Sequence, residues 1–423
     1  MGETPGSPPI SMKLPSIAAQ ARRSPEMVFN NVFHLIDGDV LREAYRRTRK
    51  DRAPGVDKVT AKQYAENLDE HLRDLHERRR ANRYVAPPVE RVWIEKEGGK
   101  KRPISKPCFE DKMVQRAVVM ILEAIVEPAF QAFSHGFRRG HSAHQAGEEV
   151  RAQCSTLHIN GRVDADVSGL FDNIDRRHLR ELIKQRVNDG GILRLIGKWR
   201  NAGVLDAGEL SYPDKGTPQG GVASPLLANI FLHHVLDEWF VTEVQPRMQG
   251  RCFLTRFADD FIIGCESKTD AQRVMAVVPK RCGRFNLPSH PEKTALIACN
   301  KPLRREHSAR GTGTCDFLGC THYWAKTRRG YWVIKWKTSG KRRRRCMQGI
   351  WTWCRENRHA PLTEQYRMLC AQLRGYYRYH GIRGNLKALR TVLEHTRRAW
   401  RYWLSRRSHK GPLHWQKYEA SMR

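Results

Sequence analysis

The stretch Arg256-Phe-Ala-Asp-Asp-Phe-Ile-Ile-Gly264 places two adjacent carboxylates inside a run of apolar residues. A second run, Val163-Asp-Ala-Asp-Val167, places Asp166 in similar surroundings. Such runs are typical of strands, and carboxylates buried side by side repel each other unless a cation neutralises them. Consecutive strand residues point to opposite faces, so Asp259 and Asp260 both reach a cation only if they lie in a tight hairpin. The two stretches predict strands that bring Asp166, Asp259 and Asp260 to a cation site.

Two Mg²⁺ ions fit this pattern. Mg²⁺ binds one or two carboxylates and keeps its other positions for water and phosphate oxygens. Two such ions, about 4 Å apart, activate a 3′ hydroxyl and stabilise the departing pyrophosphate in nucleotidyl transfer. A single Asp-Asp pair is more often a simple turn, so this interpretation depends on Asp166 and on the motifs described below.

The composition points to a folded protein that binds a polyanion. The 423 residues are enough for two or three domains, and their formal net charge of +32 favours a partner such as nucleic acid. A hydrophobic content of 40% with eleven Trp excludes a disordered basic tail. No apolar run approaches the roughly 20 residues of a membrane span, and no export signal is present. The eleven Cys include no CxxC pair, which predicts reduced thiols in a cytoplasmic protein.

Positive charge is concentrated in the last hundred residues. Residues 321–423 contain 26 Lys and Arg but four Asp and Glu. Apolar residues recur every three or four positions over 366–380 and 386–403, which, with the Arg-rich segment 341–358, predicts a three-helix bundle with a basic exterior. A solvated face normally mixes both signs, so the excess favours RNA binding over the alternative that these charges are merely solvated.

Elsewhere the pattern predicts further elements. A helix is expected over 112–126, where Pro128 ends it, and another begins at Ser224-Pro225 with Ser224 as its N-cap. Strands are expected over 161–167 and 252–265. Residues 1–25 are rich in Pro, Ser and Gly and are expected to form a flexible leader.

The order of motifs resembles a reverse transcriptase of the group II intron-encoded maturase type, over about residues 28–418. Two C-terminal segments, Leu373-Arg-Gly-Tyr-Tyr377 and Ala399-Trp-Arg-Tyr-Trp-Leu404, resemble the maturase thumb, called domain X. The other segments that carry the resemblance are, in order, Ala53-Pro-Gly-Val-Asp57, Lys101-Arg-Pro-Ile104, Glu110-Asp-Lys-Met-Val-Gln115, Gly136-Phe-Arg138, Asp166 through Ile174, Gly216-Thr-Pro-Gln-Gly-Gly-Val-Ala-Ser-Pro225, Phe257-Ala-Asp-Asp260, His290-Pro-Glu-Lys293 and Phe317-Leu-Gly319.

The resemblance implies an α+β fold of the right-hand polymerase type, with fingers, a palm containing an antiparallel sheet, and a helical thumb. No Cys/His endonuclease module follows the thumb, so we expect no second-strand cleavage by this chain. The implied domains are a flexible leader (1–25), an N-terminal extension with the start of the fingers (26–95), a fingers and palm reverse transcriptase domain (96–320), the thumb (321–406) and a short basic tail (407–423).

The resemblance also implies roles for individual residues. The catalytic and metal-binding residues would be Asp166, Asp259 and Asp260, holding two Mg²⁺ ions. Each remaining residue also has a plainer interpretation, as a core aromatic, a turn residue or a solvated charge. The implied substrate-binding residues are Phe171 (a steric gate against the ribose 2′ hydroxyl), Lys96 and Arg102 (holding the triphosphate), Gln219 (near the nucleotide) and Lys293 (facing the active site); the implied RNA-binding residues are Arg42 and Arg46, and Arg342, Arg343, Arg344 and Arg345.

The implied function is RNA-directed DNA polymerase activity, in which dNTPs extend a DNA primer on an RNA template. A maturase role, binding group II intron RNA to assist splicing and retrohoming, is implied as well. One alternative is a splicing-only RNA-binding maturase, which the three intact Asp residues disfavour. Another is a related reverse transcriptase in phage defence or CRISPR adaptation, which the thumb motif disfavours. We expect a cytoplasmic protein of bacterial type with no membrane partner.

Overall fold

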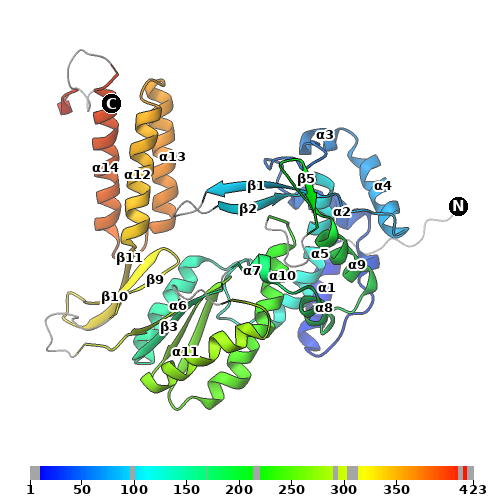
Figure 1. Cartoon of the computed structure of the whole chain (residues 1–423), viewed down its shortest axis with the longest axis horizontal. Helices are drawn as coiled ribbons and strands as arrows, with labels where there is room; N and C mark the ends of the chain where they lie inside the picture. Colours follow the sequence, from blue (N-terminus) through cyan, green and yellow to red (C-terminus); the bar gives the residue numbers. More distant parts are fainter. Residues whose placement is uncertain are drawn as a thin grey trace.

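The computed structural model describes residues 10–95, 101–167, 169–212, 220–288, 294–302, 313–407 and 413–416 (Figure 1). The chain is mixed α and β. Its α-helices are α1 (Ile10–Arg23), α2 (Gly38–Arg47), α3 (Ala61–Glu66), α4 (Leu68–Arg80), α5 (Phe109–Val126), α6 (Ala143–Thr156), α7 (Leu170–Asn173), α8 (Arg176–Lys184), α9 (Gly190–Asn201), α10 (Ser224–Leu232), α11 (Lys268–Gly283), α12 (Gly340–Glu356), α13 (Leu362–His380) and α14 (Leu386–Leu404).

The strands form three sheets. A four-stranded sheet has the order β6-β7-β3-β8, a second has the order β2-β1-β4-β5, and a three-stranded sheet has the order β11-β10-β9. Their bounds are β1 (Val89–Glu95), β2 (Lys101–Lys106), β3 (Gly161–Asp166), β4 (Val204–Asp206), β5 (Glu209–Ser211), β6 (Cys252–Phe257), β7 (Asp260–Cys265), β8 (Ala295–Ala298), β9 (Cys315–Phe317), β10 (Cys320–Lys326) and β11 (Trp332–Thr338).

The β6-β7-β3-β8 sheet is antiparallel throughout, as the sequence predicts for the sheet that holds the carboxylates. Side chains alternate between its faces. One face, including Val163 and Phe261, belongs to the largest hydrophobic core together with α5, α10 and α11. The other face, including Phe253 and Ile262, packs against α6 and the β9–β11 sheet. Asp166 and Asp260 lie at one end of this second face.

The C-terminal helices α12, α13 and α14 stand side by side, at the far side of the molecule from α1–α5 (Figure 1). They enclose a small core of their own, to which Ile350, Leu369 and Trp400 contribute. The predicted helices of this region are confirmed. The β9–β11 sheet that precedes them has no counterpart in the sequence-based expectation, although the alternation of apolar residues with Lys in β11 is typical of a half-buried strand.

Two expectations for local structure are wrong. Residues 10–23 of the expected flexible leader form α1, because Ile10, Leu14 and Ile17 recur at helical spacing and pack against the main core. Helix α10 does begin at the predicted place, but Ala223 rather than Ser224 is its N-cap. The helix predicted over 112–126 is confirmed as part of α5.

Two further features concern membrane spans and cysteines. In the part of the chain that the structure describes, no helix is long and apolar enough to cross a membrane. All eleven cysteines are free thiols, and most of them are buried.

Candidate active site

The structure brings two of the predicted carboxylates directly opposite each other. Asp166, the last residue of β3, is the antiparallel register partner of Asp260, the first residue of β7. Register partners in antiparallel strands have Cα atoms roughly 4.5–5.5 Å apart, and their side chains project from the same face. Asp259 precedes Asp260 in the connecting loop, and its carbonyl oxygen accepts a hydrogen bond from the Val167 amide at 3.3 Å. Asp166, Asp259 and Asp260 therefore lie at one end of the sheet.

A tight hairpin places Asp259 and Asp260. Phe257 pairs with Asp260 across strands β6 and β7, so that Ala258 and Asp259 alone form the loop. Ala258 has a φ of 57°, and hairpin loops of two residues favour turns with positive φ at the first of them. Gly136 packs against this loop so closely that a Cβ there would lie 2.1 Å from the Ala258 nitrogen. The hairpin that the Asp-Asp pair requires is present, and Gly136 makes room for it.

A buried ion pair supports the hairpin from the opposite face of the sheet. Arg256 is fully buried and donates to both carboxylate oxygens of Asp237, at 2.7 and 2.6 Å. Its guanidinium also donates to the carbonyl oxygen of Ala258 at 3.1 Å and to the Ser134 hydroxyl at 2.7 Å. Asp237 lies in the π-helical segment His233–Glu238. Arg256 thus ties the loop that carries Asp259 to the buried centre of the protein.

Positively charged neighbours compensate the buried charge of Asp237. Burial by itself raises the pKa of the Asp237 carboxyl, but the Arg256 guanidinium and the His233 ring outweigh it and hold the pKa below its ordinary value. A buried charge of this kind is tolerated when a partner of opposite charge also supplies hydrogen bonds. Sequence reasoning missed this pair, although an Arg inside the apolar strand 252–257 was a signal that a buried acid must face it.

Carboxylates also gather around a cavity on the other face. A cavity of about 270 Å³ is lined by Asp164, Asp166, Asp260 and Asp316, together with Phe317 and Leu318. Burial raises the pKa of Asp164 to about 6; the Arg162 guanidinium opposes the rise and the Asp316 carboxylate adds to it. No Lys or Arg is among the described residues that line this cavity. Asp164 and Asp316 were not singled out from the sequence.

The donor set suits a hard divalent cation. Mg²⁺ needs only one or two protein carboxylates and takes its other ligands from water and substrate phosphates, which the register pair Asp166 and Asp260 satisfies. A ready-made cluster of three or more His, Cys, Asp or Glu side chains suited to a metal ion is not found within the described ranges.

The wall of the cavity connects to the C-terminal helices. Leu318, which has a φ of 50°, follows β9 and accepts a hydrogen bond at its carbonyl oxygen from the Tyr379 hydroxyl of α13, at 2.9 Å. A Cβ added to Gly319 would lie 3.4 Å from the side chain of Arg342, on α12. The segment Phe317–Gly319 thus lies between the acidic cavity and the helices α12 and α13.

The remaining predicted substrate residues are placed as follows. Phe171 is half-buried on α7, directly after β3, with its ring centroid 6.4 Å from that of Phe137. Arg102 is exposed on β2, opposite Ile94 of β1. A Cβ at Gly220 would lie 2.4 Å from the Ser105 carbonyl oxygen, so the end of the predicted nucleotide loop approaches β2. Lys96, Gln219 and Lys293 lie outside the described residues.

The predicted RNA-binding arginines have different surroundings. Arg42 pairs with Asp69 at 2.6 Å, and Arg46 pairs with Glu43 at 3.4 Å. On α12, by contrast, the cations follow one another along the first turns of the helix, which has no acidic residue in its first turn. Arg343 is half-buried, while Arg342, Arg344 and Arg345 are exposed.

Paired carboxylates that line an acidic cavity in a basic protein occur in enzymes that transfer phosphate-bearing groups with the help of divalent cations. Residues 94–322, more than half of the chain, match the family model described as "Reverse transcriptase (RNA-dependent DNA polymerase)". The chain therefore belongs to the reverse transcriptase family and is an RNA-directed DNA polymerase by its domain, as the resemblance predicted.

Individual relatives refine this placement. Protein YkfC of Escherichia coli (strain K12) is 30% identical over 299 residues, which cover 62% of this chain and 78% of that protein. Group II intron-encoded protein LtrA of Lactococcus lactis subsp. cremoris is 34% identical over 244 residues, 56% of this chain and 40% of LtrA. Nuclear intron maturase 4, mitochondrial, of Arabidopsis thaliana is 29% identical over 208 residues, 47% of this chain and 23% of that protein. The matched region is thus less than half of LtrA and of the plant maturase.

Proposed function

We propose that the chain is the reverse transcriptase of a group II intron: it extends a DNA primer on an RNA template, and it also binds intron RNA as a maturase that assists splicing and retrohoming. The observation that carries the polymerase part is the pairing of Asp166 with Asp260, which both line an acidic cavity, in a chain of the reverse transcriptase family. In this proposal, β6-β7-β3-β8 is the palm sheet, α12–α14 the thumb, and β1–β2 part of the fingers.

Each part of the site has a task in primer extension. Asp166, Asp259 and Asp260 would hold two Mg²⁺ ions, which supply activation of the primer 3′ hydroxyl and stabilisation of the departing pyrophosphate. The two-residue hairpin fixes the carboxylates relative to each other, and Arg256 fixes the hairpin. The Phe317–Gly319 segment is placed to position the primer end between the cavity and the thumb helices.

The roles assigned to the fingers rest on placement along the chain. Arg102 is exposed on β2 and Gly220 approaches the same strand, so the triphosphate and the nucleotide base would lie between them. A planar guanidinium donates two parallel hydrogen bonds to phosphate, which suits Arg102 to this role. Phe171, just beyond Asp166, would exclude a ribose 2′ hydroxyl and thereby select dNTPs.

The maturase role is supported by charge and by relatives. The helices α12–α14 contain a large excess of Lys and Arg, and neutralising phosphates with such residues releases counterions and favours RNA binding. LtrA is named as a group II intron-encoded protein and the Arabidopsis relative as an intron maturase.

Primer extension tests the polymerase proposal. The purified chain, given a primed RNA template, Mg²⁺ and dNTPs, should extend the primer. Asp259→Asn should reduce extension by roughly 100-fold or more while leaving RNA binding nearly unchanged, because in this proposal the Asp259 charge binds the cations and not the template. Asp39→Asn, which removes one charge from an exposed position on α2, is the matched control. Extension by Asp259→Asn at the control rate would refute the assignment.

A further inference from the structure

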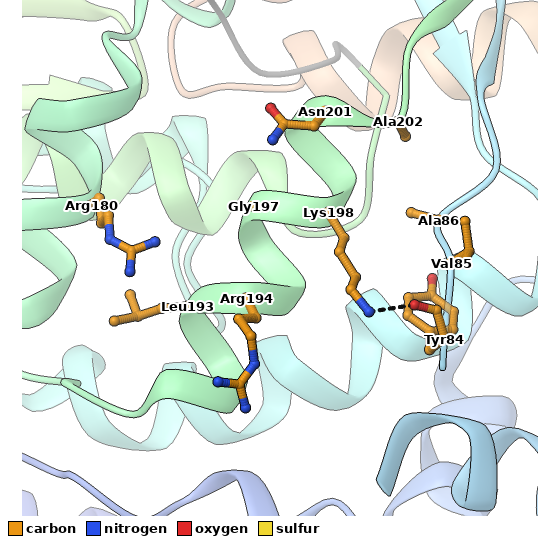
Figure 2. A pocket seen from close by; sticks show the side chains of 10 residues that line it. All are labelled: Tyr84, Val85, Ala86, Arg180, Leu193, Arg194, Gly197, Lys198, Asn201 and Ala202. Carbon is orange, nitrogen blue, oxygen red and sulfur yellow. Dashed lines mark hydrogen bonds between the residues drawn. The ribbon is translucent and has the colours of Figure 1, made fainter. Parts of the chain in front are cut away.

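A groove lies between α8 and α9, away from the carboxylates. Two adjoining cavities, of about 450 and 220 Å³, share the lining residues Arg180, Leu193, Gly197 and Asn201. The larger cavity also borders the segment Tyr84–Ala86, as Figure 2 shows. We call these two cavities the α8–α9 groove. In Figure 1, α8 and α9 lie at the opposite side of the molecule from the thumb helices.

The walls of the α8–α9 groove are cationic and its floor is apolar. Among the described residues that line either cavity there is no Asp or Glu. Arg177, Arg180 and Arg194 are exposed, and none of the ion pairs between described residues includes them. The apolar floor is formed by side chains from both helices, namely Leu179, Ile183, Leu193 and Ile196.

The acidic residues near the groove are engaged elsewhere. Asp175 and Asp189 cap the N-termini of α8 and α9, each accepting two backbone amide hydrogen bonds of its helix. Glu181 pairs with Lys184 at 2.9 Å. Burial, together with the neighbouring Arg176 charge, lowers the pKa of Arg200 to about 10, and the Asp175 carboxylate opposes the shift.

One cation of the groove has an internal structural role. Lys198 donates through Nζ to the carbonyl oxygen of Tyr84 at 2.5 Å and to that of Asn82 at 3.2 Å, and Figure 2 shows the first of these bonds. Lys198 therefore holds the segment before β1 against α9. This leaves the guanidinium groups of Arg180 and Arg194, on either side of the groove, to meet a ligand.

We propose that the α8–α9 groove is a docking surface for RNA, in which Arg180 and Arg194 bind backbone phosphates and the apolar floor accommodates the sugars or bases of a loop. Exposed guanidinium groups bind phosphate and also stack on bases, which suits single-stranded RNA loops. The inference rests on the proposed function, since a chain that serves an intron must hold an RNA larger than the primed template. An RNA that contacts both this groove and the thumb would extend across the molecule.

The α8–α9 groove contrasts with the arginines on α2 and directly after it. Arg42, Arg46 and Arg47 each have a carboxylate oxygen of Asp69 or Glu43 within 3.4 Å, and Arg49 pairs with Asp51 at 2.5 Å. An RNA phosphate must compete with these carboxylates at α2, but not at Arg180 and Arg194. We therefore expect the groove to contribute more to RNA affinity than the α2 cluster does.

The test compares two double variants that each remove two positive charges. Arg180→Gln with Arg194→Gln changes the groove. Arg247→Gln with Arg251→Gln, at two exposed arginines that pair with Glu243 and Glu266, is the matched control. Binding of a transcribed group II intron RNA is measured without dNTPs over a range of KCl concentrations. The groove variant should bind roughly tenfold more weakly, with a salt slope shallower by about 1.5, and the control should change by less than threefold.

Further arms exclude a folding artefact and a different nucleic acid. Arg180→Lys with Arg194→Lys keeps both charges and should recover most of the lost affinity. If the groove variant binds as the natural chain does, or loses no more affinity than the control, the proposal is overturned. A loss seen with duplex DNA but not with the intron RNA also overturns it. Because no dNTPs are present, a failure of primer extension would count against the polymerase assignment and leave this measurement intact.

Discussion

The two faces of the β6-β7-β3-β8 sheet differ in how their charged side chains are arranged. On one face, Arg256 and Asp237 are fully buried and neutralise each other. On the other, Asp164, Asp166, Asp260 and Asp316 line one cavity. Because side chains alternate between the two faces of a strand, Arg256 and Asp260 project from opposite faces of the sheet. The sheet therefore separates the ion pair that supports the hairpin from the carboxylates proposed to bind cations. The buried Arg256–Asp237 ion pair stabilises the fold. The carboxylates that line one cavity indicate where a cationic ligand would bind.

The largest expected effect comes from breaking the balanced pair. Arg256→Leu leaves the Asp237 carboxylate buried without its partner, which should lower the free energy of unfolding by about 3–5 kcal/mol. Arg256→Leu combined with Asp237→Leu should recover much of that loss, because no buried charge remains. Chemical denaturation measures both variants.

The control for this experiment is an exposed ion pair that flanks the other end of strands β6 and β7. Arg251 contacts Glu266 at 3.1 Å, and Arg251→Leu should cost less than about 1 kcal/mol. If Arg256→Leu were no more costly than Arg251→Leu, the buried pair would not support the hairpin.

The next prediction concerns the cluster of positive charge at the start of α12. Replacing Arg342, Arg343, Arg344 and Arg345 by Gln should weaken binding of intron RNA by roughly 100-fold and reduce the salt slope by about 3, because each phosphate contact contributes about 0.7–0.9 to that slope. Equilibrium binding at several KCl concentrations measures both quantities. An unchanged slope would assign this run to ordinary solvated charge.

A smaller effect is expected from pH at the acidic cavity. The pKa of Asp164 is about 6 in the folded chain, mainly because the carboxyl is buried, against about 4 when the chain is unfolded. The folded state therefore holds this proton more tightly, and the stabilisation it gives is full below about pH 4 and is lost as the pH rises to about 6. Asp164→Asn should flatten this part of the pH profile, because the group that titrates there is removed.

The pH prediction is checked by denaturation of the natural chain and of Asp164→Asn between pH 4 and 8. Asp39→Asn, at an exposed position, should leave the slope of the natural chain in place. If the natural chain gained stability between pH 4 and 6 relative to Asp164→Asn, the predicted direction of the pH dependence would be wrong.

The sequence analysis predicted those helices and strands whose residue pattern is local. The apolar periodicity of α5, α13 and α14 and the apolar runs of β3, β6 and β7 are visible in the sequence, and the Asp-Asp pair required the hairpin that the structure contains. The order of motifs led to the reverse transcriptase family. These features depend on residues a few positions apart.

The features that were missed depend on contacts between distant residues. The partner of Arg256 lies nineteen positions away in a π-helical segment. The Asp164 carboxylate meets Asp316 only after the β9–β11 sheet has packed on β6 and β7. Helix α1 was missed because its Pro and Ser residues hide an apolar stripe that makes sense only against α5. The charge compensation of Arg42 by Asp69 is likewise a tertiary contact.

The most direct test of the central claim is a double-mutant cycle on the register pair, scored by primer extension in Mg²⁺. If Asp166 and Asp260 hold the same cations, Asp166→Asn and Asp260→Asn should each reduce the rate by roughly 100- to 1000-fold, and the double variant should be little worse than either single variant. Losses that multiply in the double variant, or a single variant that extends the primer at the natural rate, would contradict the shared cation site.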